Sequence, residues 1–288
     1  MPRLTVSCFG DLTARLDRTP VTGLTNSKAL ALWVYVAAQG KPCPRSVLSS
    51  LFWGESSEAA ARTSLRQTLR RLRQLLPGFI EAGDHVVTVP AGAAAACDLL
   101  TMYRLLDADP PAGAALLGLN VESLFAGLQL RHAPAFDDWL AHTRDDALRR
   151  TLEAMGRAAA HCRADDPQLA VALHRRCLAL APWAENHHRA LMALFMDLGD
   201  APSALAQFEA CRSALAAELD VGPHPDTVAL AQGIRAQAGR ASAQAEDLLP
   251  AAAEVIAPGP TVAPAPQPRP PPTKPTPTQY QGREAEHR

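Results

Sequence analysis

The alternation of apolar and polar residues predicts a small antiparallel sheet at the start of the chain. Across residues 4–21 apolar side chains alternate with polar ones, and the segment Asp17–Pro20 has the composition of a turn. The apolar spacing then becomes helical over residues 30–38, where Gly40 and Pro42 end the helix. A second short helix is expected at residues 45–52.

A third helix is expected at residues 58–76. Ser57 is a favourable N-cap for it, and the pair Pro77-Gly78 stops it. The apolar segments Phe79-Ile80 and Val86–Val89 are then expected to form a β-hairpin. Strands, three helices and a hairpin in this order predict an α+β winged helix-turn-helix domain over residues 1–97.

From about residue 99 to residue 234 the pattern is helical throughout, and it repeats. Three residues, Asp166, Ala170 and Cys177, recur 34 positions later as Asp200, Ala204 and Cys211. This period, with alanine where paired helices approach closely, is the tetratricopeptide pattern. We therefore expect an all-α, tetratricopeptide-like helical repeat domain over residues 98–240.

The remainder of the chain differs in composition. Residues 250–278 contain eleven prolines, which exclude regular helix or sheet and leave little apolar surface to bury. We therefore expect a disordered, Pro-rich C-terminal tail, with a linker over residues 241–279.

Charge separates the first two regions. Residues 1–97 carry eleven Lys and Arg against six Asp and Glu, whereas residues 98–240 carry thirteen against eighteen. The basic first region predicts a polyanionic partner for that region alone. The sequence shows no signal peptide and no long apolar run, and its six cysteines are widely spaced. We therefore expect a cytoplasmic protein with reduced, mostly buried thiols.

The third helix carries the candidate binding chemistry. At about 100° per residue, four leucines at positions 65, 69, 72 and 76 form one stripe that faces the core. A helix in the major groove reads guanine with arginine and adenine with glutamine, and arginines at the margin of the helix suit phosphates. A solvated basic face is the alternative interpretation. The candidate DNA-binding residues are Thr63, Arg66, Gln67, Arg70, Arg71, Gln74, Arg62 and Arg73.

Three segments of the first region resemble the OmpR-like winged helix of the Streptomyces antibiotic regulatory protein (SARP) family. They are Leu4–Gly10, Leu48–Gly54 and Ala61–Arg73. Residues 98–235 resemble the bacterial transcriptional activation domain that follows in that family, through Asp137–Leu140, Ala181–Glu185 and Glu218–Pro225. The resemblance extends over roughly 235 of the 288 residues, in the family's order.

The resemblance implies a non-enzymatic, sequence-specific transcriptional regulator, usually an activator. Such a protein binds double-stranded promoter DNA at direct repeats and contacts RNA polymerase, and self-association on DNA is a further expectation. The resemblance maps the recognition helix onto residues 58–76 and the wing onto residues 79–89, and it implies no cofactor. The wing departs from the family, since Asp84-His85 stands where a Gly-Tyr pair is common, so wing contacts are less firmly implied than helix contacts.

The last residues resemble the start of a further domain. Residues 280–288 match the Gly-Arg-Glu opening of the AAA-like nucleotidase domain that follows in large members of the family. We therefore expect the chain to be the N-terminal part of such a regulator, although it contains no P-loop itself. Two alternative functions stay open: a fragment of a nucleotide-gated signalling ATPase, and a helical-repeat adaptor whose basic domain contacts protein.

Other reactive side chains are interpreted as structural. His187-His188, and His174 with Cys177, lack further ligands at metal-binding spacing, so no metal site is predicted. The acidic pairs Asp137-Asp138 and Asp145-Asp146 are expected to lie on a solvated helix face and to form i, i+4 ion pairs with nearby arginines, which are Arg144, Arg149 and Arg150. The four tryptophans are expected to anchor the core, and no catalytic residue is assigned.

Overall fold

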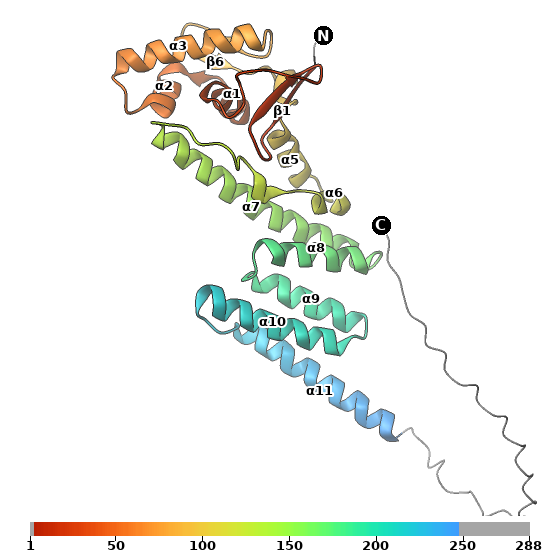
Figure 1. Cartoon of the computed structure of the whole chain (residues 1–288). Coiled ribbons are helices and arrows are strands. Elements are labelled where there is room, and N and C mark those ends of the chain that lie inside the picture. The colour runs from red at the N-terminus through yellow and green to blue at the C-terminus, as the bar shows by residue number, and fades with distance from the viewer. Residues whose placement is uncertain (1–2, 248–288) are drawn as a thin grey trace, which may run out of the picture. The chain divides into compact units, whose positions relative to one another are not determined.

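The chain begins with a three-stranded antiparallel sheet. The computed structural model describes residues 3–247, with the side chains of residues 3–240 (Figure 1). The strands lie in the order β1 (Leu4–Ser7), β2 (Thr13–Leu16), β3 (Thr19–Pro20). The register pairs Leu4 with Leu16 and Val6 with Ala14, so the apolar side chains share one face. Asp17 and Arg18, both at positive φ, form the predicted turn between β2 and β3.

Three helices follow at the predicted positions: α1 (Lys28–Gln39), α2 (Arg45–Trp53) and α3 (Glu58–Leu75). The side chain of Ser27 caps the start of α1 by accepting a hydrogen bond from the Leu30 amide at 3.2 Å. At its other end Gly40 adopts the left-handed conformation, with φ 63°, and its amide donates to the Ala37 carbonyl. The prediction that Gly40 ends this helix is therefore confirmed.

The hairpin after α3 is shorter than predicted and begins later. Its strands are β5 (Glu81–Ala82) and β6 (Val86–Thr88), so Phe79 and Ile80 precede the first strand. The reason is tertiary packing: Ile80 is 5% exposed, and Trp33 Nε1 donates a hydrogen bond to the Phe79 carbonyl at 2.8 Å. A further strand, β4 (Cys43–Pro44), pairs with β6, and two residues are too few for an alternating pattern to predict it.

A group of short helices connects the wing to the repeat region. They are α4 (Ala91–Ala94), α5 (Asp98–Leu106), α6 (Gly113–Leu117) and the 3-10 turn η1 (Val121–Ser123). This segment pairs with the N-terminal sheet, because the Val6 amide donates to the Ala96 carbonyl at 2.9 Å and the Phe125 amide donates to the Cys8 carbonyl at 2.6 Å. Residues Met1–Ser242 consequently form one compact unit.

Aromatic side chains join the long helix α7 (Pro134–Cys162) to α1 and α2. The ring centroids of Phe52 and Phe136 lie 4.9 Å apart, and those of Tyr35 and Trp139 lie 5.2 Å apart. Phe52 is 0% exposed and Phe136 is 1% exposed. The hydrophobic core is therefore continuous from the winged helix into α7.

The helical repeat predicted from the 34-residue period is confirmed. Four helices follow α7, namely α8 (Pro167–Leu180), α9 (Glu185–Asp197), α10 (Ala201–Leu219) and α11 (Pro225–Asp247), and α7 to α10 pack on one another in chain order (Figure 1). The carboxylates of Asp166 and Asp200 cap α8 and α10 at equivalent positions. Ala170 and Ala204 are both 0% exposed, as expected where helices approach closely.

Replacing Ala204 by leucine should lower the free energy of unfolding by about 1–3 kcal/mol, because the larger side chain overpacks a fully buried position. The matched control is Ala210→Leu on the same helix, where the side chain is exposed and the expected change is within about 0.5 kcal/mol. Thermal or denaturant unfolding of the purified variants measures both effects. Equal stability of the two variants would contradict the repeat register.

The cysteines match their prediction and the tryptophans match theirs only in part. All six cysteines are free, and five are buried, with Cys162 half-buried, as expected for reduced thiols.

Trp33 is 0% exposed but Trp183 is 43% exposed, so the prediction that all four tryptophans anchor the core is wrong for Trp183. This residue lies in the short turn between α8 and α9, beside the helix faces that pack together.

Helix α11 extends seven residues into the predicted linker, since it ends at Asp247. The sequence there is rich in alanine, which favours helix. The rest of the predicted linker and the segment 280–288, with its resemblance to a nucleotidase domain, lie outside the described residues. Among residues 3–247, no helix combines the length and the apolar character that crossing a membrane requires.

Candidate nucleic-acid interface

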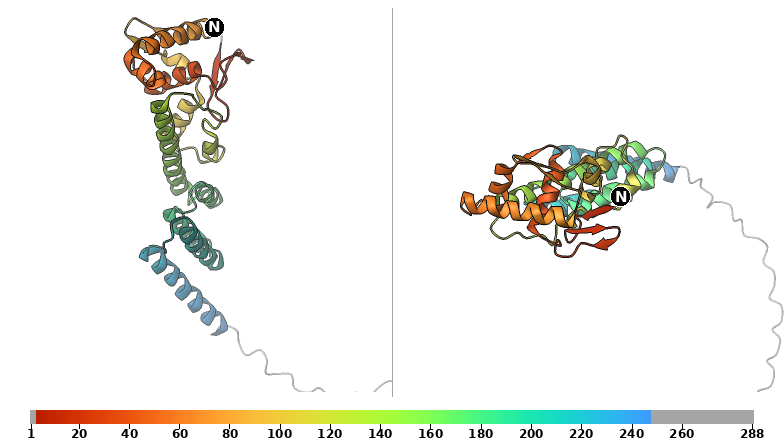
Figure 2. Two further views of the ribbon diagram at one scale, coloured as in Figure 1. Left: turned by 60° about the vertical axis from the view of Figure 1, so that its left-hand side comes forward. Right: turned by 90° about the horizontal axis from the view of Figure 1, so that it is seen from above.

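Helix α3 runs along the outside of the N-terminal region in both views of Figure 2. Its apolar stripe is buried as predicted, with Leu65, Leu69 and Leu72 at 3%, 1% and 0% exposure. The Ser57 side chain caps the helix by accepting a hydrogen bond from the Ala60 amide at 3.4 Å. One face of α3 is thus fixed to the core while the opposite face is open to a partner.

All eight candidate residues on α3 are exposed, and two of them make contacts within the helix itself. Arg62 pairs with Glu58 at 2.6 Å, and the Thr63 hydroxyl donates to the Ala59 carbonyl at 2.9 Å. Exposed pairs of this kind contribute less than about 1 kcal/mol. Both side chains can therefore exchange these contacts for contacts to a ligand.

Two other candidates reach neighbouring segments. Arg71 Nη2 donates to the Gly23 carbonyl at 2.8 Å, and Gly23 has a φ of 78°, which favours glycine. Arg73 donates to the carbonyl of Ala82 in the wing. In this structure Arg71 supports the loop before α1 and Arg73 holds the wing against α3, and the sequence predicted neither contact.

The remaining four candidates have no hydrogen bond or ion pair with any residue in the described part of the chain. They are Arg66, Gln67, Arg70 and Gln74. At 3.6 residues per turn they fall within about 100° of the helix circumference, away from the leucine stripe. Two guanidinium groups and two carboxamides therefore share one exposed face of α3.

A cleft of about 550 Å³ lies between α3, the start of α2 and the wing turn. Its lining includes Arg45, Arg62, Arg66, His85, Glu58 and Asp84. The Arg45 amide donates to the His85 carbonyl at 2.9 Å, and the Arg45 Nε is buried without a hydrogen-bond partner among the described residues. Sequence reasoning missed Arg45 and His85 because only the tertiary fold brings them to α3, and the position of Arg45 at the start of a short helix was the one available signal.

The histidines considered as metal ligands connect helices of the repeat region. His174 Nδ1 and His187 Nδ1 lie 3.0 Å apart, and His188 Nε2 lies 2.9 Å from the Pro182 carbonyl. Burial, with smaller contributions from His187 and Arg163, lowers the pKa of His174 to about 4. The pKa of His187 is also lowered, mainly by burial. The two rings therefore form a neutral, hydrogen-bonded contact between α8 and α9 at pH 7.

The ion pairs predicted on α7 are confirmed for Asp146 alone, since Asp137, Asp138 and Asp145 make no ion pair among the described residues. Arg149 contacts Asp146 and Glu153, one turn away in each direction. Arg150 contacts Asp107 on the C-terminal side of α5 and also Asp146. Each of these charged groups has a partner of opposite charge within the protein, which supports a structural role for this cluster.

Comparison with protein families identifies the second region of the chain. Residues 102–235 match the family model described as the bacterial transcriptional activator domain. This match agrees with the resemblance drawn from the sequence of residues 98–235. No curated protein matches the chain.

A solved structure, Mycobacterium tuberculosis EmbR in complex with a low-affinity phosphopeptide, is similar to this chain. The TM-score is 0.59 at 20% sequence identity, and the alignment covers 82% of this chain and 66% of that chain. This chain therefore spans slightly less than two thirds of the length of the solved protein. At such identity the likeness concerns the fold, and it confirms the predicted order of a winged helix followed by helical repeats.

Proposed function

We propose that this chain, whose residues 102–235 match the bacterial transcriptional activator domain, is a SARP-like transcriptional regulator that acts by binding promoter DNA through α3. In this proposal α3 enters the major groove with its open face towards the base edges. The wing and the start of α2 then lie along the sugar-phosphate backbone. Residues 102–235 contact RNA polymerase and so make the bound protein an activator.

The observation that carries the proposal is the group of four side chains without internal partners on α3. Arg66, Gln67, Arg70 and Gln74 are exposed and free to form new hydrogen bonds. Arginine pairs bidentately with guanine and glutamine with adenine, and each such pair contributes about 1–3 kcal/mol of base discrimination. A face of this composition is therefore able to read sequence as well as to bind charge.

The charge around α3 supports binding to a polyanion. Residues 1–97 have a net charge of +5, and the cleft between α3 and the wing gathers Arg45, Arg62 and Arg66 beside Glu58 and Asp84. Phosphate contacts of this type release counterions and make the affinity depend on salt. They position the protein on the duplex but carry no base information.

Arg71 and Arg73 contribute to DNA binding indirectly, because their hydrogen bonds hold α3 in position. Arg73 links α3 to the wing through Ala82, and Arg71 links α3 to the loop at Gly23. Both contacts tie α3 to neighbouring segments of the N-terminal region. We place the protein in the cytoplasm, where its DNA target lies, and assign it no catalytic step.

Gln67→Ala and Arg70→Ala should each weaken binding to the specific site by about 1–3 kcal/mol and should relax base preference, because each removes one pair with a base edge. Footprinting on the upstream region of the gene identifies the site, and gel-shift titrations against that site and a scrambled duplex measure the effect. Arg66 also lines the cleft where phosphate contacts are proposed, so Arg66→Ala should instead weaken binding to both duplexes and lower the salt slope by about one.

The matched control is Arg212→Ala, which removes an exposed arginine from α10 and should leave binding unchanged. If Gln67→Ala and Arg70→Ala bind the specific site as tightly as the unaltered protein does, α3 is not the reading helix. If the unaltered protein does not distinguish promoter from scrambled DNA, the alternative of a protein-binding adaptor replaces the proposal.

A further inference from the structure

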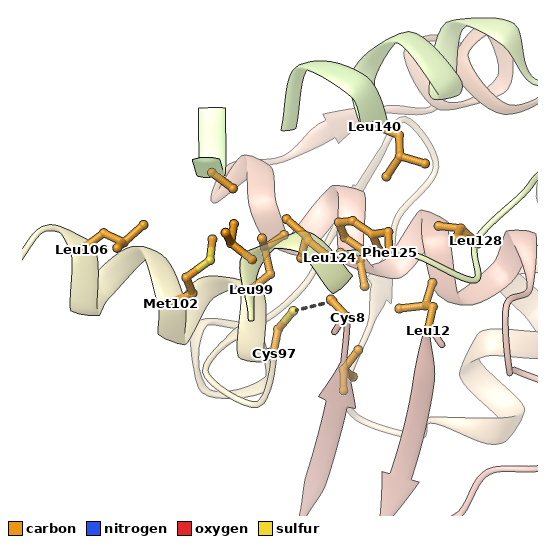
Figure 3. Packing of buried hydrophobic residues seen from close by; sticks show 14 of the residues in the cluster. Cys8, Leu12, Cys97, Leu99, Met102, Leu106, Leu124, Phe125, Leu128 and Leu140 are labelled. Carbon is orange, nitrogen blue, oxygen red and sulfur yellow. Dashed lines mark hydrogen bonds between the residues drawn. The ribbon is translucent and has the colours of Figure 1, made fainter. Parts of the chain in front are cut away.

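Two thiols from distant parts of the chain meet at the end of β1. Cys8 follows β1, Cys97 immediately precedes α5, and their sulfur atoms lie 3.7 Å apart (Figure 3). Both residues are 0% exposed. The segments that carry them also pair through their backbones, since Val6 and Cys97 form an isolated parallel bridge.

A carboxylate completes this group of side chains. The Asp98 Oδ1 accepts a hydrogen bond from the Cys8 amide at 2.8 Å, and Oδ2 accepts one from the Ser7 hydroxyl at 2.8 Å. These two bonds fix the orientation of the carboxylate. A ligand atom from each of Cys8, Cys97 and Asp98 lies within 4.8 Å of the others.

We propose that Cys8, Cys97 and Asp98 bind a single thiophilic divalent cation of the zinc class. Zinc–sulfur bonds of about 2.3 Å at a tetrahedral angle separate two sulfurs by about 3.8 Å, close to the 3.7 Å observed here. The two thiolates alone balance the charge of such a cation, the carboxylate adds a third anionic ligand, and a water molecule provides the fourth ligand.

The surroundings of the three ligands suit a bound ion. On one side the thiols are enclosed by apolar residues that include Leu12, Leu99 and Phe125 (Figure 3), so water has no access from the core. On the other side Ser7 and Asp98 are half-exposed, which gives the ion a path of entry. The hydrogen bonds from Ser7 and the Cys8 amide act as the outer contacts that orient a metal-bound carboxylate.

A disulfide between Cys8 and Cys97 accounts for the positions of these side chains less well than a bound cation does. A disulfide needs sulfurs about 2.05 Å apart, and fully buried thiols react slowly with oxidants. The oriented carboxylate of Asp98 has no part in a disulfide, whereas a cation uses all three groups. The ion would connect β1 to α5 and thereby stabilise the junction between the winged helix and the activator domain.

The test is a titration of the full chain, reduced and free of metal, with Co²⁺ under anaerobic conditions. Tetrahedral cobalt bound to thiolates gives a near-ultraviolet charge-transfer band, and we expect this band to saturate at one equivalent and to disappear on addition of Zn²⁺. Cys8→Ser and Cys97→Ser should each abolish the band. Asp98→Asn should weaken cobalt binding at least about 10-fold, while Cys162→Ser, the control, should leave it unchanged.

Two results would overturn the proposal. One is a band that persists in Cys8→Ser, which would place the metal at other cysteines. The other is the absence of any band in the unaltered protein, with or without a mass loss of two hydrogens that marks a disulfide. Should a serine variant fail to fold, X-ray absorption at the zinc edge of the unaltered protein decides the question: we expect two sulfur ligands, and none or four would contradict the site. Metal binding is independent of DNA binding, so neither result bears on the proposed function.

Discussion

Replacing Phe136 by alanine should lower the free energy of unfolding by about 3–5 kcal/mol, the range for a buried phenylalanine. Phe136 is 1% exposed, and its ring lies 4.9 Å from that of Phe52 and 5.2 Å from that of Trp139, between centroids. Alanine leaves a cavity where α7 meets α2, because the rigid helices on both sides cannot close it. Denaturant unfolding monitored by circular dichroism measures the loss.

The same measurement on Trp183→Ala provides the control. Trp183 is also a large aromatic residue, but it is 43% exposed, so its loss should cost well under half as much as the loss of Phe136. Phe136→Leu should fall between the two, since it removes less volume. If Phe136→Ala and Trp183→Ala destabilise the protein equally, the packing of α7 against α2 is not as the structure describes it.

The parts of the fold that the sequence predicted well are those in which local pattern and tertiary burial agree. The leucine stripe of α3 has the period of a helix, and its members are buried against the core. The repeat was visible because Asp166 and Asp200 cap equivalent helices, and Ala170 and Ala204 fill equivalent crossings. In these cases the residues of a short segment are sufficient to predict the local structure.

The parts that the sequence did not predict depend on contacts between distant segments. β4 exists because Cys43 pairs with Val87, and the wing begins late because Trp33 holds the Phe79 carbonyl. No local pattern contains either partner. The thiols of Cys8 and Cys97, 89 positions apart in sequence, are brought together only by the pairing of β1 with the segment before α5.

The candidate site shows the same division. The sequence of α3 identified eight candidate residues outside the leucine stripe, but it could not separate the four that are free from the four that are engaged. Arg71 is drawn to Gly23 and Arg73 to Ala82, and both partners lie outside the helix. Arg45 and His85 join the cleft for the same reason. A helical pattern shows which face is polar, whereas the fold decides which polar groups have partners.

The protein should lose stability as the pH falls from about 6.5 towards 4, and His174 should account for much of the loss. The His174 and His187 rings lie 3.0 Å apart between α8 and α9, and burial lowers the pKa of His174 to about 4. In the unfolded chain the same group titrates near 6.5. Between these values the unfolded chain binds a proton that the folded protein excludes, so the free energy of unfolding decreases with falling pH.

A lowering of the pKa from 6.5 to about 4 corresponds to roughly 3 kcal/mol, which is fully present above the unfolded pKa and lost at about pH 4. Chemical denaturation at pH 7, 6, 5 and 4 measures the total change, which also includes carboxylates. His174→Gln isolates the contribution of the pair, because glutamine can donate to His187 without titrating, and its stability should fall less steeply over this range. His142→Gln, at an exposed position of α7, should keep the steep dependence. If the free energy of unfolding falls equally steeply with pH in His174→Gln and His142→Gln, the folded protein does not exclude a proton from the His174–His187 pair. The prediction that this pair causes acid sensitivity would then be wrong.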